Sequence, residues 1–431
     1  MKKSDRWVKG FLPMIFMSFS TGMVYCWTLF REDIEAWGTV YRPGEGYISI
    51  FTPQILTLCF MLALFCLGMT AAFGGSIVER SVKRAALYTF IFFTLGWIVT
   101  GIGIYVRSPI LTVVGFGPIQ GIGLGLGYLA PIKTLMMWFD DKKGFAAGVA
   151  IAAFGLAGLI GNPLLGILLS IDRLTVYQAF FILTALFGVL CFSAYILIDR
   201  PPLKEIDAAA RTLSAKEVIL SKKFIFLWVV LFINISAGLA LMSHEQQIYI
   251  MTGLDAVDNR ALIVLFCTLT AGGGNLIGRL ITASSQDKTN KKHLPYYVMA
   301  LASIAMCAIS FAILPHHYIP MFITIFVVQF FFGCGFACLP GILDQQYGMK
   351  QLATIQGYML TAWAFAALAG PQIASSILVL ADPVTGAPAV VGTLDTLYAV
   401  LAGMFVVQLV FLLLFVRACK KDKTQLETVK A

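Results

Sequence analysis

Charged residues are scarce in this chain. Asp, Glu, Lys and Arg make up 12% of its 431 residues, whereas apolar and aromatic residues make up 59% and the mean hydropathy is +0.86. A soluble domain carries about a quarter of its residues charged, because its surface faces water. The composition therefore excludes a soluble globular protein and indicates a chain that lies mostly in lipid.

The residue patterns of common enzyme sites are also missing. The four histidines form no H-E-x-x-H pattern, and the nine scattered cysteines contain no C-x-x-C pair. There is no P-loop, and no polar stretch is large enough to hydrolyse ATP. Four glycines between Gly121 and Gly127 superficially resemble a nucleotide fingerprint, but no strand precedes them. We therefore expect no enzyme, no cofactor and no metal site, and transport driven by a gradient.

Long apolar stretches are abundant instead. Each of them has roughly 18 to 25 residues or more, which as a helix is enough to cross a hydrocarbon core of about 30 Å. The sequence predicts an all-α integral membrane protein with twelve transmembrane helices, at residues 11–31, 48–73, 85–106, 110–138, 145–170, 175–198, 223–250, 261–284, 295–314, 318–343, 353–380 and 396–416.

The longest polar stretch, residues 199–222, divides these helices into six and six. The predicted organisation is an N-terminal half at 1–198, a linker at 199–222, a C-terminal half at 223–416 and a tail at 417–431. Two six-helix halves joined by a linker are typical of a secondary transporter with a pseudo-twofold axis along the membrane normal.

Positive charge indicates the orientation, because Lys and Arg accumulate in cytoplasmic loops. With the amino terminus inside, the cytoplasmic segments hold 24 of the 31 lysines and arginines, and the opposite face holds five. Both termini, the linker and the tail are thus predicted to be cytoplasmic. This bias explains the net charge of +9 without nucleic acid as a partner.

Two loops repeat a charge motif. Glu79 and Arg80 follow the second predicted span, and Asp287 and Lys288 follow the eighth. An acidic residue followed by a basic one in these loops resembles the loop motif of the major facilitator superfamily. The resemblance implies that these residues pair with neighbouring helix ends when the cytoplasmic side is closed, although charged loops also serve simply as topology signals.

A longer stretch is more specific. "GIGLGLGYLAPIKTLMMWFDDKKGFAAG", residues Gly121 to Gly148, is similar to helix 4 and the following loop of the oxalate/formate antiporter family, relatives of the monocarboxylate transporters. "GMVYCWTLF", residues Gly22 to Phe30, fits the same family. The resemblance implies a transporter in the inner bacterial membrane.

Arg279 is a cation within a predicted span, eight residues or about 12 Å before Asp287. It shares a polar and small-residue stripe with Thr268, Gly272 and Asn275, opposite an apolar stripe. We expect this stripe to face the bundle interior and Arg279 to bind a small carboxylate, with the Asn275 amide adding a hydrogen bond. The alternative is an arginine that snorkels to the headgroups or has a structural role. An arginine here is the family's substrate-binding cation, as the resemblance implies.

The chain departs from the family pattern in helix 11. Members that handle the dicarboxylate oxalate carry a lysine there, whereas this chain has Trp363. One cation instead of two favours a monoanion. Trp363 is then either an apolar wall against an alkyl tail or a tryptophan packed between helices.

Other polar residues in the spans are weaker candidates. Tyr128, Tyr25 and Gln120 are predicted to contact the substrate, with interhelical hydrogen bonds as the alternative for Tyr128. Lys133 is expected to snorkel to the cytoplasmic surface. His244 and Glu245 either carry a coupled proton or form a hydrogen-bonded pair at the outer rim.

The predicted function is secondary transport of small organic anions, most consistent with monocarboxylates such as lactate and pyruvate. Proton symport and anion exchange both remain open. The expected partners are the carboxylate, protons and the lipid bilayer, and the expected functional unit is a monomer. The alternatives are a facilitator of another cargo, such as an amino acid, siderophore or drug, and a sensor of transporter shape.

Overall fold

The computed structural model describes residues 5–43, 46–171, 173–201, 213–254, 259–286, 288, 291–313, 317–348, 350–378 and 392–430. Asp287 and His316 lie outside these residues. The described part is almost entirely helical, and a two-stranded antiparallel sheet is formed by β1 (Thr39–Arg42) and β2 (Gly46–Ser49).

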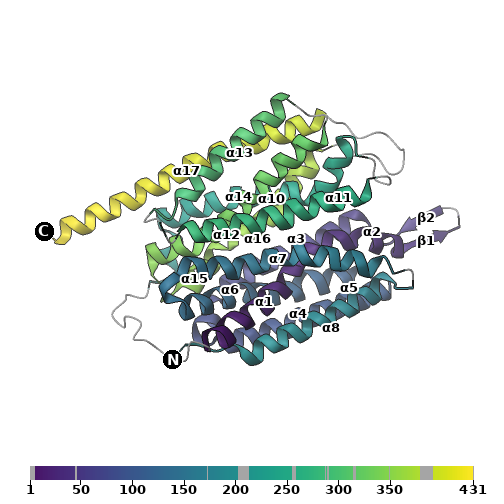
Figure 1. Ribbon diagram of the computed structural model, residues 1–431, viewed down its shortest axis with the longest axis horizontal. Coiled ribbons are helices and arrows are strands. Elements are labelled where there is room, and N and C mark those ends of the chain that lie inside the picture. Colours follow the sequence, from purple (N-terminus) through teal and green to yellow (C-terminus); the bar gives the residue numbers. More distant parts are fainter. Residues whose placement is uncertain are drawn as a thin grey trace.

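The first half of the chain forms one helical bundle (Figure 1). Its elements are η1 (Arg6–Phe11), α1 (Leu12–Gly22), η2 (Met23–Cys26), α2 (Trp27–Gly38), α3 (Pro53–Arg80), α4 (Val82–Tyr105), α5 (Pro109–Val114), η3 (Gly115–Ile119), α6 (Gln120–Trp138), η4 (Asp140–Lys142), α7 (Lys143–Leu169) and α8 (Val176–Leu197).

The second half forms another bundle beside the first (Figure 1). It consists of α10 (Lys222–Met251), α11 (Arg260–Cys267), η5 (Thr268–Gly274), α12 (Asn275–Gln286), α13 (Leu294–Ile313), α14 (Tyr318–Tyr347), α15 (Leu352–Met359), α16 (Thr361–Ile377) and α17 (Gly392–Lys430). A short helix of the linker, α9 (Ala215–Ile219), precedes it. The chain ends lie toward one end of the molecule, here called the termini end, and the strands of residues 39–49 lie at the opposite, hairpin end (Figure 1).

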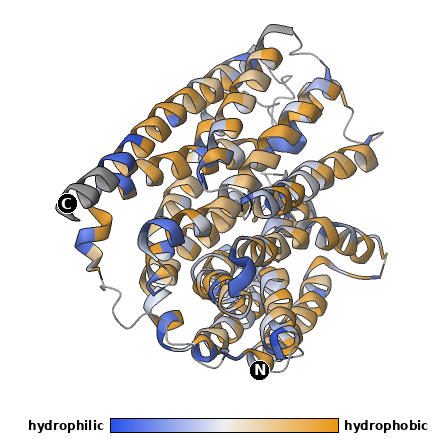
Figure 2. Cartoon of the chain, turned by 60° about the vertical axis from the view of Figure 1, so that its left-hand side comes forward, coloured by the Kyte–Doolittle hydropathy of each residue, from blue (hydrophilic) through white to orange (hydrophobic). Residues whose placement is uncertain are grey.

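Ten helices of the described residues are long and apolar enough to cross a bilayer. The first predicted span is a pair bent by 55°, Arg6–Cys26 and Leu29–Gly38, and α13 contains a shorter apolar helix, Leu294–Ile309. Hydrophobic residues cover most of the helices, and many hydrophilic ones lie toward helix ends and connections (Figure 2). The outer surface exposes large apolar side chains such as Phe73, Ile110 and Val189, as a lipid-facing surface does.

The structure corrects several predicted boundaries. The second span begins at Pro53, because residues 46–49 form β2, and it continues to Arg80. Its start is set by Pro53, which suits the first helical position, and by Thr52, whose hydroxyl accepts from the Ile55 amide at 3.4 Å. The eleventh span is broken at Leu360 into α15 and α16, and the last helix continues through the predicted tail to Lys430.

The two halves meet along two seams that are rich in glycine. In one seam α3 packs against α15 and α16, and in the other α7 packs against η5 and α12. A Cβ atom at Gly75 would lie 2.7 Å from the Cα atom of Thr354, and one at Gly148 would overlap the Cβ atom of Ala283. Glycine therefore permits an approach of the two halves that a larger residue would prevent.

Candidate substrate site between the two halves

Arg279 lies at the interface of the two bundles and is completely buried. Its Nε atom donates a 2.6 Å hydrogen bond to Oδ1 of Asn275, and its Nη1 atom donates to the carbonyl oxygen of Ile151 in the other half. Its guanidinium carbon lies 5.3 Å from the ring centre of Phe336 on α14. The guanidinium therefore points into the protein, and it does not reach a membrane surface as a snorkelling arginine would.

The charge of Arg279 is not matched by a carboxylate in the described part of the chain, where none of the ion pairs includes it. A buried charge is costly without a counter-charge or hydrogen bonds. The Ile151 carbonyl and the Asn275 amide oxygen satisfy two of its donors, while the Nη2 atom has no partner with good geometry among the described residues. The site thus keeps positive charge and a free donor.

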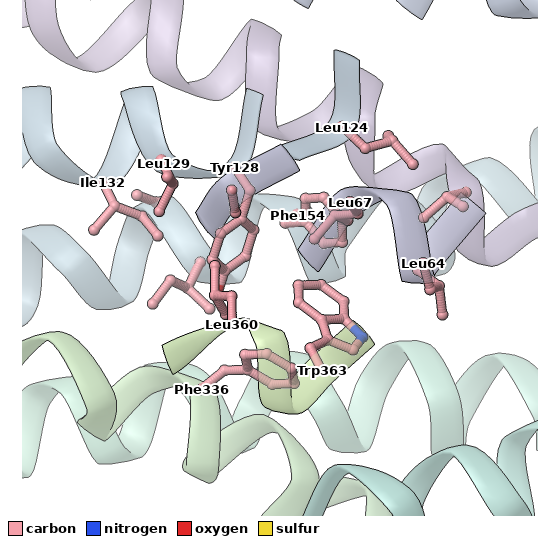
Figure 3. Close-up of a cluster of buried hydrophobic side chains, with 14 of the residues drawn as sticks. Leu64, Leu67, Leu124, Tyr128, Leu129, Ile132, Phe154, Phe336, Leu360 and Trp363 are labelled. Carbon is pink, nitrogen blue, oxygen red and sulfur yellow. The ribbon is translucent and has the colours of Figure 1, made fainter. Parts of the chain in front are cut away.

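Aromatic rings from both halves surround this position. Tyr128 lies 5.5 Å from Phe154 and 5.3 Å from Trp363, measured between ring centres, and Trp363 lies 4.6 Å from Phe336. Tyr25 packs edge-on against Phe154 at 5.4 Å. In Figure 3, Tyr128 and Phe154 of the first half extend toward Trp363 and Phe336 of the second. The rings form an apolar wall that excludes water beside the cation.

Several polar atoms of Asn275 and of the aromatic wall are buried and lack hydrogen-bond partners within the described residues. They are Nδ2 of Asn275, the hydroxyl of Tyr128 and Nε1 of Trp363. The Tyr25 hydroxyl lies beside the Arg279 guanidinium and interacts with it. Each buried donor without a partner costs about 1–3 kcal/mol, so an anion that accepts from them would be stabilised.

Of the predicted substrate contacts, the structure brings together Arg279, Asn275, Tyr25, Tyr128 and Trp363 through the contacts described above. Gln120 lies elsewhere. Its Cα atom would be 2.7 Å from a Cβ atom on Gly96, so it packs against α4 within the first half. Its buried amide has no hydrogen-bond partner among the described residues.

A cavity of about 220 Å³ lies between the two halves toward the hairpin end. Its lining includes Tyr25, Gly158, Asn162, Glu245 and Gly272. Tyr25 belongs both to this lining and to the surroundings of Arg279. The cavity therefore approaches the cation from the hairpin end, and Tyr25 stands where the two regions meet.

His244 and Glu245 have different partners in the described structure. The Nδ1 atom of His244 lies 2.8 Å from the Ser243 hydroxyl. Glu245 is 3% exposed and accepts hydrogen bonds from the hydroxyls of Tyr249, at 3.0 Å, and Thr270. The expected alternative of a His244–Glu245 pair at the outer rim is wrong, because Glu245 is buried on the side of α10 that faces η5 and bonds Tyr249 and Thr270 instead.

At the termini end, Glu79 connects the halves. Its Oε1 atom accepts a 2.8 Å hydrogen bond from the Ala353 amide at the start of α15, and its Oε2 atom lies 3.0 Å from Nζ of Lys133. Lys133 is 5% exposed, so the expectation that it snorkels to the surface is wrong. The ion pair with Glu79 holds it inside. Arg80 and Lys288 are exposed.

A second contact crosses the halves at the same end. Nζ of Lys143 at the start of α7 lies 3.4 Å from Oδ2 of Asp344 near the end of α14. In this structure the termini end is thus held together by Glu79 on one seam and by the Lys143–Asp344 pair beside the other.

Comparison with known proteins decides the family. The sequence pattern of the Major Facilitator Superfamily matches residues 6–371, most of the chain. The chain belongs to the Major Facilitator Superfamily. It is a multi-pass membrane transporter and not an enzyme, as the sequence predicted.

Curated members of the superfamily are similar over most of their length. The chain is 23% identical over 364 residues to YhjX of Escherichia coli (strain K12), an uncharacterized MFS-type transporter, covering 82% of this chain and 83% of that one. It is 24% identical over 389 residues to the oxalate:formate antiporter of Oxalobacter formigenes, covering 86% and 85%. The predicted resemblance to that antiporter family is confirmed.

A short segment is more similar to another carrier, and solved structures confirm the fold. The chain is 44% identical over 61 residues to apicoplast pyruvate carrier 1 of Toxoplasma gondii, which covers 14% of this chain and 11% of that one. FucP in an outward conformation matches with a TM-score of 0.64 at 15% identity, covering 94% and 98% of the chains. The human organic anion transporter MFSD10 matches with a TM-score of 0.63 at 14% identity, covering 95% and 100%.

Sequence reasoning missed several residues of this transporter's interface. Phe154 and Phe336 gave no signal, because an aromatic residue in a spanning helix looks the same whether it faces lipid or the interior. The Ile151 carbonyl and the Lys143–Asp344 pair depend on contacts between residues far apart in the chain.

Proposed function

We propose that the protein is a secondary transporter of small organic anions, with monocarboxylates of the lactate and pyruvate type as its cargo. The observation that carries this proposal is the buried Arg279, whose charge meets no carboxylate in the described chain. A planar guanidinium binds a carboxylate through paired hydrogen bonds, and the site is dry enough to strengthen them.

The size and charge of the site favour a monoanion. One cation stands among aromatic rings, and Trp363 fills the position at which oxalate carriers of the resembled family have a lysine. A second carboxylate group would lie against apolar rings and lose hydration without compensation. A short alkyl or keto tail suits that wall.

The relatives support an organic anion as cargo. One relative is named as an antiporter of oxalate and formate, and another is named as a pyruvate carrier. Formate and pyruvate are monoanions, and a carboxylate is the group that all three compounds share. We infer that the same group is recognised here by Arg279, with Asn275, Tyr128 and Tyr25 as further donors.

Alternating access would involve the two seams. We infer that the termini end is cytoplasmic, since Lys and Arg concentrate in the segments assigned to it, and that the membrane is the inner membrane of a bacterium. Glu79 would then hold the cytoplasmic side closed by capping α15 and pairing with Lys133, and Lys143 with Asp344 would support it. Cargo would enter from the hairpin end past Tyr25.

Binding by the purified protein in lipid nanodiscs tests this proposal. L-lactate, pyruvate, formate and oxalate should be compared with the uncharged lactamide by thermal unfolding. A ligand at about 100 times its Kd stabilises the folded state by about 2.7 kcal/mol, so a monocarboxylate should raise the Tm and lactamide should not. Arg279→Gln should abolish the shift, whereas Arg84→Gln, which removes an exposed arginine, should retain it.

The same panel separates the alternatives. Stabilisation by amino acids, siderophores or drugs, with none by monocarboxylates, would contradict the proposed cargo. Binding without any flux in liposomes would favour a sensor over a transporter.

A further inference from the structure

Glu245 is a buried acid near the end of α10, on the side of the interface toward the hairpin end. It is 3% exposed and lies on the wall of the 220 Å³ cavity. Its Oε1 atom receives the hydroxyls of Tyr249 on the same helix and of Thr270 on η5. The carboxyl group is therefore buried among protein atoms and reachable from the cavity.

The side chains nearest Glu245 carry hydroxyl, thiol and imidazole groups. Tyr249 and His244 belong to its own helix, Cys267 and Thr270 face it from the α11–η5 segment, and Tyr398 faces it from α17. Across the cavity lie Arg31 and Glu35 of α2. None of the ion pairs of the described residues includes Glu245. An ionised carboxylate is costly in such surroundings, and the group avoids that cost by taking up a proton.

The count of hydrogens points the same way. The Thr270 hydroxyl carries one hydrogen and lies 2.8 Å from the carbonyl oxygen of Phe266, its usual partner one turn back in a helix. When Thr270 donates to Phe266, the hydrogen in its bond with Glu245 has to come from the carboxyl group. The observed arrangement thus accommodates a protonated Glu245.

The partner of Glu245 lies in an irregular part of the substrate-binding helix. Thr270 belongs to η5, a π-helical segment of residues 268–274 that runs directly into α12 and Arg279. Gly272 of η5 packs on α7 of the other half, where its Cβ position would be 3.0 Å from the Leu159 nitrogen. Such π-helical segments are frequent at functional sites. A change at Glu245 therefore acts on the helix that holds the cargo and on the seam between the halves.

We propose that Glu245 is the proton-binding site of a symporter that carries one proton with each monocarboxylate, an inference that rests on the proposed function. The proton enters from the cavity and binds the carboxylate, and the acid donates to Thr270 while Thr270 keeps its bond to Phe266. On release the carboxylate takes the Thr270 hydrogen instead, which frees the Phe266 carbonyl and loosens η5. One anion and one proton leave together, so the step moves no net charge.

Liposomes containing the purified protein test this inference with two assays on the same variants. With the outside about one pH unit more acidic than the inside, wild type should accumulate labelled L-lactate about tenfold inside the liposomes, since one proton moves with each anion. E245Q keeps the size of a protonated acid but holds no exchangeable proton. This variant should lose the accumulation, and it should also lose the rise in external pH that accompanies proton uptake. It should still exchange labelled for unlabelled lactate at equal pH.

Matched variants locate the effect. Glu35→Gln removes another carboxylate of the cavity lining, and His244→Gln removes the neighbouring titratable group. Both should keep proton-driven accumulation. Since a variant that exchanges lactate is folded, retained exchange also controls for misfolding of E245Q.

The outcomes separate the two proposals. Proton-driven accumulation by E245Q would overturn the inference, as would loss of both accumulation and exchange. If wild type exchanges lactate but a proton gradient drives no accumulation, the inference is overturned and the proposed function stays intact. Wild type that exchanges none of the monocarboxylates would contradict the proposed function itself.

Discussion

The side chain of Arg279 is held by Asn275 one helical turn away, through a 2.6 Å bond from Nε to Oδ1. This bond uses the Nε–H group of Arg279 and helps to fix the plane of the guanidinium. The Nη1 atom is held by the Ile151 carbonyl of the other half, so Arg279 connects both halves. The Nη2 atom and the Asn275 Nδ2 atom remain for an anion, because neither has a partner among the described residues.

Tyr128→Phe should weaken substrate binding without weakening the fold. The hydroxyl is buried and has no hydrogen-bond partner in the described structure, so its removal should leave the Tm of the empty protein unchanged or higher. A hydrogen bond to a charged group contributes about 1.5–3 kcal/mol, so the Kd for lactate should rise about ten- to a hundredfold. Titration calorimetry measures the Kd, and an unchanged value would remove Tyr128 from the site.

Trp363→Lys should shift the preference toward dicarboxylates. The ring of Trp363 lies 5.3 Å from that of Tyr128, so a lysine there would place a second cation in the same wall as Arg279, where one monoanion cannot neutralise both charges. Oxalate affinity should rise relative to lactate by about tenfold or more, which corresponds to about 1.4 kcal/mol. The control Trp363→Phe keeps an aromatic wall and should keep the preference for lactate. Equal preferences in wild type and Trp363→Lys would show that Trp363 only packs between helices.

Gly148→Ala should hinder closure of the termini end. The added Cβ atom would overlap that of Ala283 across the seam. Gly166→Ala on the same helix is the control, because no atom lies within 4 Å of its Cβ position. Spin labels at the exposed positions 84 and 288, with Cys66, Cys267 and Cys419 replaced by serine, report the separation of the halves. The distance distribution should move to longer values in Gly148→Ala alone; identical distributions in both variants would refute a role for this close approach.

Glu79→Gln should destabilise the closed state because it removes the carboxylate that lies 3.0 Å from the ammonium group of the buried Lys133. Removing one partner of a buried ion pair costs about 3–5 kcal/mol, and we expect the lower end here, since the Glu79 side chain is 19% exposed. Adding Lys133→Met should restore most of the loss, because it removes the buried ammonium group that Glu79 neutralised. Thermal unfolding in nanodiscs measures both variants. If the double variant is as unstable as Glu79→Gln, the lost stability comes from the α15 cap instead.

The halves could be predicted from sequence because long apolar stretches lie on either side of a polar linker, and the interior position of Arg279 could be predicted from helical periodicity. Apolar length predicts a span, and a polar stripe at 3.6-residue spacing predicts an inward face. Contacts between distant residues leave no such trace. Lys133 looks the same in sequence whether it snorkels or pairs with Glu79, and only the packing of α3 on α6 decides it.

Irregular helix geometry was also beyond sequence reasoning. Helical periodicity placed Gly272 on a polar and small-residue stripe, but it did not reveal that residues 268–274 form a π-helical segment. Gln120 was predicted to contact the substrate. The structure places it against Gly96, where the absence of a side chain makes room for it.

The role of Arg279 as the anion site is tested by exchange of labelled L-lactate by liposomes containing wild type, Arg279→Gln or Arg84→Gln, at equal pH on both sides. Equal pH removes any contribution of proton coupling, so the assay reports only anion binding and alternating access. We expect exchange by wild type and Arg84→Gln, and a rate at the level of empty liposomes for Arg279→Gln. Exchange by Arg279→Gln at the wild-type rate would show that the anion binds elsewhere.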